Sequence, residues 1–145
     1  MNDNDFLIDS NILVYAFDTS EGKKHEQAKA LLNKCWDGFV SFSISLQNLH
    51  EFYFVLTTKK KHLVNPDLTG LFVKHFIEFQ GWKKLIPGQA SILKAIKIVK
   101  QYKLPFWDAH LVAVMLENNI HHIYTEDVAD FKKFPNIVAI DPFES

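Results

Sequence analysis

Short apolar runs alternate along the chain with longer segments whose apolar residues recur at the spacing of one helix face. The runs predict strands at residues 6–9, 39–43, 83–86, 120–125 and 136–140. The periodic segments predict helices after Ser10, over residues 24–36, after Ser45, after Asn65, over residues 89–103 and from Pro105 to Glu117. This alternation predicts one α/β domain, residues 1–145, with a mostly parallel sheet and helices on both faces.

The composition is typical of a globular domain. The sequence has 145 residues, of which 48% are hydrophobic and 14% aromatic, so one sizeable core is expected. No apolar run reaches the roughly 20 residues that a membrane span needs, and the polar start MNDNDF is not typical of a signal peptide. The single cysteine, Cys35, cannot form an internal disulfide. These features favour a reducing, cytoplasmic location away from membranes.

The charge pattern limits how the chain can handle phosphates. The formal net charge is −1, so the sequence lacks the overall basic character typical of many nucleic-acid-binding domains. All sixteen basic residues are lysines, and arginine, which grips phosphate with two parallel hydrogen bonds, is absent. Any phosphate chemistry must therefore rely on lysine, on backbone N–H groups or on a metal ion.

Four acidic residues stand beside segments that otherwise look built for a core. Asp9 directly follows the first predicted strand, and Asp127 closely follows the strand predicted at 120–125. If these strands are parallel, both acids emerge at the carboxyl edge of the sheet, where ligands bind in such folds. Glu51 interrupts the apolar stretch HEFYFVL, and Asp108 lies in the first turn of the most apolar helix.

Each acid also has a purely structural interpretation. Asp9 and Asp127 could cap helical turns, Asp108 could face the positive end of its helix dipole, and Glu51 could face solvent. Considered together, buried acids are unfavourable unless they are paired or bind metal, so a shared cation explains all four better. Oxygen ligands favour Mg²⁺ or Mn²⁺, which activate water for phosphodiester hydrolysis. Close carboxylates repel one another, so at least one should have a raised pKa without metal.

At these residues the chain resembles a known family, the PIN-domain ribonucleases, and within it the VapC-type toxins of toxin–antitoxin pairs. The matching segments are FLIDSNILVYA, LHEFYFVL, PFWDAHLVAVMLENN and IYTEDVADF, in the family's order. The resemblance implies a three-layer α/β/α sandwich and a Mg²⁺- or Mn²⁺-dependent endoribonuclease that hydrolyses RNA. It also implies a homodimer that is neutralised by a cognate antitoxin protein.

The resemblance also implies a role for individual residues. It makes Asp9, Glu51, Asp108 and Asp127 the catalytic and metal-binding acids. Ser10 and Asn11 match the small polar residues after the first acid, and Thr125 matches the hydroxyl residue before the last one.

Some other polar residues are candidates for binding. The lysine cluster Lys59, Lys60 and Lys61 is a candidate contact for the RNA backbone, and a solvated helix end explains it about equally well. The adjacent His121 and His122 would point to opposite faces of a strand, which disfavours zinc. Asp18 has no acidic neighbour of this kind and is expected at the surface.

Two other functions stay open from the sequence. One is a non-catalytic PIN-like interaction module, against which the complete set of acids argues. The other is a structure-specific DNA nuclease with the same chemistry, which the short chain makes less favourable because it leaves no room for added DNA-binding segments.

Overall fold

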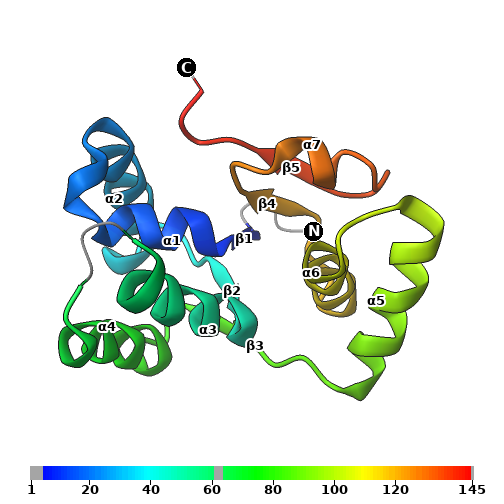
Figure 1. The fold of residues 1–145 in the computed structure, drawn as a ribbon, viewed down its shortest axis with the longest axis horizontal. Coiled ribbons are helices and arrows are strands. Elements are labelled where there is room, and N and C mark those ends of the chain that lie inside the picture. The colour runs from blue at the N-terminus through cyan, green and yellow to red at the C-terminus, as the bar shows by residue number, and fades with distance from the viewer. Residues whose placement is uncertain (1–4, 61–63, 145) are drawn as a thin grey trace.

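A parallel sheet of short strands lies at the centre of the computed structural model, which describes residues 5–60 and 64–144 (Figure 1). The strands within these ranges are β1 (Phe6–Ile8), β2 (Ser43–Ser45), β3 (Lys83–Leu85), β4 (His122–Tyr124) and β5 (Val138–Ile140). Their spatial order is β3-β2-β1-β4-β5, and all neighbouring pairs are parallel. In the middle strand, Leu7 lies opposite Ser43 on one side and Ile123 on the other. The parallel α/β architecture expected from the sequence is confirmed.

Helices connect the strands in the predicted order. They are α1 (Ser10–Phe17), α2 (Lys23–Trp36), α3 (Leu46–Phe54), α4 (Pro66–Glu78), α5 (Gln89–Tyr102), α6 (Phe106–Glu117) and α7 (Val128–Phe131). A 3₁₀ turn over Thr19–Glu21 precedes α2, and a π-helical turn over Val55–Lys59 extends α3. Side-chain caps start several helices where the sequence predicts them. For example, the side chain of Asn65 accepts from the N–H groups of Asp67 and Leu68.

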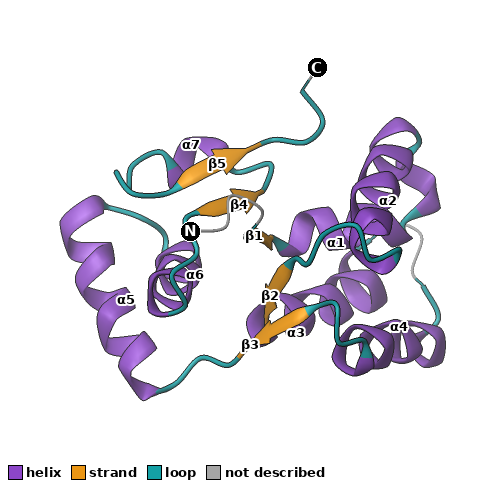
Figure 2. Cartoon of the chain, turned by 180° about the vertical axis from the view of Figure 1, so that it is seen from behind, coloured by secondary structure: helices purple, strands orange, loops and turns teal. Residues whose placement is uncertain are grey.

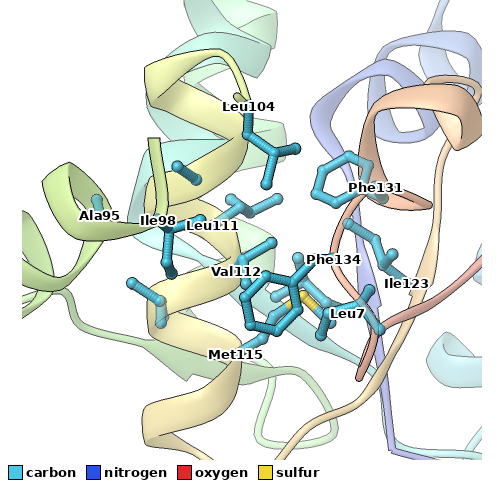
Figure 3. Packing of buried hydrophobic residues seen from close by; sticks show 14 of the residues in the cluster. Leu7, Ala95, Ile98, Leu104, Leu111, Val112, Met115, Ile123, Phe131 and Phe134 are labelled. Atoms are coloured by element: carbon cyan, nitrogen blue, oxygen red, sulfur yellow. The ribbon is translucent and has the colours of Figure 1, made fainter. Parts of the chain in front are cut away.

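The helices cover the sheet on both sides, because alternate residues of each strand point to opposite faces. Leu7 and Ile123 join the core formed with α5, α6 and α7, part of which Figure 3 shows. Ile8 and Ile44 join the second core, formed with α1 to α4. Seen from behind, the strands lie between these two groups of helices (Figure 2). The fold is thus the three-layer α/β/α sandwich.

Helix α6 is enclosed as its apolar sequence predicts. All residues from 109 to 115 are buried, so this helix packs on most of its sides rather than along one stripe. Its first turn, which carries Asp108, stays closer to the surface. In the described part of the chain, no helix is both long and apolar enough to cross a membrane.

The strand expected at residues 39–43 is the clearest error of the sequence reasoning about elements. The strand β2 starts only at Ser43, and the preceding residues form a loop. The N–H groups of Phe39 and Val40 donate to the carbonyl of Lys34, at distances of 2.9 and 3.2 Å. These donors therefore close the end of α2 instead of pairing with a strand, and Phe39 is 82% exposed.

Candidate active site

The carboxyl edge of the sheet gathers the acids that the sequence singles out. Asp9 follows β1, and its N–H donates to the carbonyl of Tyr124 at the end of β4, at 3.0 Å. Asp127 follows the same end of β4 after Thr125 and Glu126. Because β1 and β4 are parallel and in register, both acids leave the sheet on one side, as expected.

A pocket of about 290 Å³ opens at this edge. It is lined by all four predicted acids, Asp9, Glu51, Asp108 and Asp127. These acids come from four separate segments: the ends of two strands, the middle of α3 and the first turn of α6. Ser10 and Asn11 also line the pocket, from the first turn of α1. The fold thus brings together residues that are more than a hundred positions apart in the sequence.

Asp9 is held in place by hydrogen bonds on both carboxylate oxygens. The N–H of Ser10 donates to Oδ1 at 2.7 Å, and the Thr125 hydroxyl donates to Oδ2 at 2.7 Å. Burial raises the pKa of Asp9 to about 6, although these two hydrogen bonds act in the opposite direction. The negative charges of Glu51 and Asp127 contribute to the same rise. Asp9 is therefore a rigidly oriented carboxyl group that exchanges its proton just below neutral pH.

Thr125 and Asn11 connect the first acid to the last one. The Thr125 hydroxyl, besides donating to Asp9, accepts from the N–H of Asp127 at 3.0 Å. The side-chain amide of Asn11 donates to Asp127 Oδ2 at 3.4 Å. Burial, followed by the charges of Asp130 and Glu126, raises the pKa of Asp127.

Glu51 is oriented by a chain of hydrogen bonds that runs through Gln47 to α6. Gln47, one turn earlier on α3, donates from Nε2 to Glu51 Oε1 at 3.0 Å and to the Trp107 carbonyl at 3.3 Å. The Oε1 of Gln47 therefore faces His110, whose Nδ1 donates to this oxygen at 2.8 Å. The spacing of four residues between Gln47 and Glu51 predicts their contact. No sequence signal predicts the link from Gln47 to α6.

Asp108 has the most perturbed carboxyl group in the pocket. Burial raises its pKa to about 7, and the charges of Asp9, Asp130 and Asp127 add to the shift. The expected rise in pKa is therefore present, but its largest cause at Asp9, Asp108 and Asp127 is burial rather than mutual repulsion.

The three clustered lysines do not share one position. Lys60 lines the pocket, whereas Lys59 is exposed and its ammonium lies 5.6 Å from the centre of the Phe54 ring. Lys61 falls outside the described residues. The sequence could not distinguish Lys59 from Lys60, because the π-helical turn that ends at Lys59 changes the helical phase just before Lys60.

Two acids near the pocket make other contacts. Glu126 accepts from the Tyr15 hydroxyl at 2.7 Å and pairs with Lys24 at 2.6 Å, and it does not line the pocket.

Asp18, expected at the surface, is buried instead, with only 4% of its surface exposed. It turns inward because the backbone and hydroxyl of Ser20 and the ammonium of Lys60 satisfy its carboxylate.

Comparison with known proteins identifies the family. The PIN domain family matches residues 6–137 of the chain. The chain belongs to the PIN domain family. PIN domains are generally nucleases, and they generally use divalent metal ions. The chain has no significant match among curated proteins.

Solved structures of other PIN proteins share this fold at low sequence identity. VapC20 of Mycobacterium tuberculosis, described as a toxin that cleaves the sarcin-ricin loop, matches with a TM-score of 0.69 and 16% identity, over 91% of this chain and 96% of its own. A toxin–antitoxin complex from Klebsiella pneumoniae matches with a TM-score of 0.65 and 20% identity, over 97% and 99%. VapBC2 of Rickettsia felis, bound to a fragment of promoter DNA, matches with a TM-score of 0.65 and 14% identity, over 94% and 97%.

The donor set of this PIN pocket fits a hard divalent cation. In residues 5–60 and 64–144, no three His, Cys, Asp or Glu side chains form a ready-made metal cage. Mg²⁺ does not need such a cage, since it keeps several waters and uses only one or two carboxylates. In addition, the buried Oδ1 of Asn11, a residue that lines the pocket, accepts no hydrogen bond within the described residues. This oxygen and the four carboxylates supply the all-oxygen surroundings that Mg²⁺ and Mn²⁺ favour.

Proposed function

We propose that this PIN domain is a Mg²⁺- or Mn²⁺-dependent endoribonuclease that hydrolyses RNA phosphodiester bonds as the toxin of a toxin–antitoxin pair. The observation that carries the proposal is the convergence of Asp9, Glu51, Asp108 and Asp127 on one pocket at the carboxyl edge of the sheet. RNA is the preferred substrate because a protein of the same fold is described as cleaving the sarcin-ricin loop.

In the proposed mechanism, the four acids would hold one or two metal ions. The fold orients the side chains of these acids before any metal binds. Thr125 and Ser10 fix both oxygens of Asp9, and Gln47 fixes one oxygen of Glu51. Mg²⁺ or Mn²⁺ held by these acids would supply positive charge beside the phosphate and would lower the pKa of a nearby water. Asp9 and Asp108 must be deprotonated to hold a cation, so activity should rise as pH passes through about 6 to 7.

The proposed partners are a cognate antitoxin, a second copy of the chain and RNA, in a cytoplasmic setting. Toxin–antitoxin complexes among proteins of this fold support the antitoxin. Ile92, Leu93 and Ile96 on α5 are exposed, which supports burial of this apolar surface in a homodimer. Light scattering of the purified chain, alone and with the product of a neighbouring gene, tests both assemblies.

The decisive experiment compares the wild type with Asp9→Asn in Mg²⁺ and in Mn²⁺, on single-stranded RNA and DNA of one sequence. Asp37→Asn is the matched control, because Asp37 is an exposed acid at the end of α2. We expect the wild type and Asp37→Asn to cleave RNA, and a folded Asp9→Asn to leave it intact.

Each other result contradicts the proposal in a distinct way. Full RNA cleavage by folded Asp9→Asn would contradict the assignment of Asp9 and its pocket as the catalytic site. Cleavage of DNA alone favours the DNA nuclease, and no cleavage of either substrate by the metal-loaded wild type favours the non-catalytic module. Circular dichroism of each variant establishes that it is folded.

A further inference from the structure

Lys60 occupies an unusual place for a lysine in this chain. Among the described residues that line the acidic pocket, it is the only Lys or Arg. The pocket otherwise carries the carboxylates of Asp9, Glu51, Asp108 and Asp127. The backbone N–H of Lys60 donates to the Val55 carbonyl at 3.2 Å, so the π-helical turn fixes the position from which the Lys60 side chain extends.

The ammonium of Lys60 is fixed by contacts from another part of the chain. It lies 3.3 Å from Asp18 Oδ2 and 3.3 Å from Glu21 Oε1, and 5.4 Å from the centre of the Tyr15 ring. Asp18 is itself buried and held by Ser20. A lysine ammonium has three donors, and these two carboxylates engage two of them. These two contacts leave one donor uncommitted, and the side chain is 23% exposed and lines the pocket.

Lys59 differs from Lys60 in each of these respects. It is exposed, it does not line the pocket, and its ammonium lies over the face of the Phe54 ring. A mobile surface lysine adds little directed binding energy, whereas a fixed ammonium loses little freedom when it meets an anion.

An RNA strand that enters this pocket meets strong negative charge. Metal ions held by the carboxylates would compensate that charge where the carboxylates converge, but they would leave the neighbouring phosphates of the RNA uncompensated. The chain has no arginine to neutralise them. A fixed lysine at the wall of the same pocket meets this need, because neutralising phosphates is the main sequence-independent source of affinity for nucleic acids.

We propose that Lys60 binds a backbone phosphate of the RNA beside the scissile bond, with Asp18 and Glu21 positioning its ammonium. This inference rests on the proposed function, since it assumes that RNA enters the pocket. It assigns the binding role to Lys60 rather than to the lysine cluster as a whole. The other interpretation is that Lys60 only neutralises the buried Asp18, in which case removing it alters stability without altering affinity for RNA.

The test measures binding of fluorescent single-stranded RNA to the Asp9→Asn protein in Mg²⁺, which separates binding from cleavage. Lys60→Ala is compared with Lys59→Ala and with Lys74→Ala, whose lysine is exposed on α4 and faces Glu78. We expect Lys60→Ala to weaken binding about tenfold and to lower the slope of log affinity against log salt by about 0.7, the value for one phosphate contact on a single strand. Lys60→Arg should retain most of the affinity, and Lys74→Ala should leave affinity and slope unchanged.

Loss of folding is controlled by a second variant. Lys60→Ala leaves the buried Asp18 charge without its partner, so Asp18→Asn is combined with Lys60→Ala to remove both charges. The double variant should fold and still bind RNA weakly. Unchanged affinity and slope in folded Lys60→Ala or in the double variant overturn the inference, as does an equal loss in Lys59→Ala or Lys74→Ala. If the wild type neither binds nor cleaves RNA, the proposed function itself fails.

Discussion

Asp9 should make the metal-free protein less stable at neutral pH, and replacing it with asparagine should relieve this effect. Its carboxyl group is buried and titrates at about 6 in the fold, against 3.8 for the ordinary side chain. The folded state therefore binds the proton more tightly than the unfolded state. Between pH 3.8 and about 6, the folded state keeps the proton that the unfolded state has released, so the free energy of unfolding falls as pH rises. The stability that protonated Asp9 retains at pH 4 is thus lost above pH 6.

The size of the effect follows from the shift in pKa. A difference of about 2 pKa units, at 1.36 kcal/mol for each unit, corresponds to about 3 kcal/mol lost by pH 8. Asparagine has nearly the same shape and carries no charge. Its side-chain oxygen can still accept from the Ser10 N–H, and its amide can donate to the Thr125 hydroxyl. Asp9→Asn should therefore stabilise the metal-free protein by up to about 3 kcal/mol at pH 8 and by little at pH 4.

Urea unfolding in EDTA at pH 4, 6 and 8 measures this difference. Asp37→Asn, at an exposed site, is the control and should follow the wild type at every pH. The reasoning is refuted if Asp9→Asn is no more stable than the wild type at pH 8, or if its gain in stability is the same at pH 4. Such a result would mean that Thr125 and Ser10 stabilise the ionised carboxylate enough to offset its burial.

Two further predictions follow from the same pocket. Saturating Mg²⁺ or Mn²⁺, at about 100 times its dissociation constant, should stabilise the wild type by about 2.7 kcal/mol at pH 8. The gain should shrink at pH 5.5, where Asp9 and Asp108 bind protons instead, and thermal melts at both pH values test this. Gln47→Leu removes the donor to Glu51 and leaves His110 Nδ1 unpaired, so it should cost about 1–3 kcal/mol in urea unfolding and lower kcat for RNA more than RNA affinity.

The layers of the fold and the acids of the pocket could be predicted because they depend on local pattern and on the geometry of parallel strands. Asp9 directly follows β1, and Asp127 comes shortly after β4. The alternating residues of these strands must fill two cores, so both acids had to emerge at the carboxyl edge. Of the strand predicted at residues 39–43, only Ser43 lies in β2, because an apolar alternation does not reveal that the end of α2 has already used the backbone donors of Phe39 and Val40.

Contacts between distant segments set the remaining features, and the sequence carries no local signal for them. Asp18 turns inward not only because Ser20 binds it locally but also because Lys60, over forty residues later, meets it across the fold. Gln47 orients Glu51 only because α6 brings the Trp107 carbonyl and His110 to its other side.

The surroundings of the pocket explain how a chain without arginine can hold four carboxylates close together. Loss of solvation beside the apolar core raises the pKa values of Asp9, Asp108 and Asp127, which favours their protonated forms in the metal-free pocket. The metal-free pocket thus limits its own repulsion by holding protons. Since those protons must leave before metal binds, metal affinity and activity should both change across one pH range, from about 6 to 7. A metal affinity that does not change with pH across that range would show that protons on these acids do not compete with metal, and would contradict this explanation.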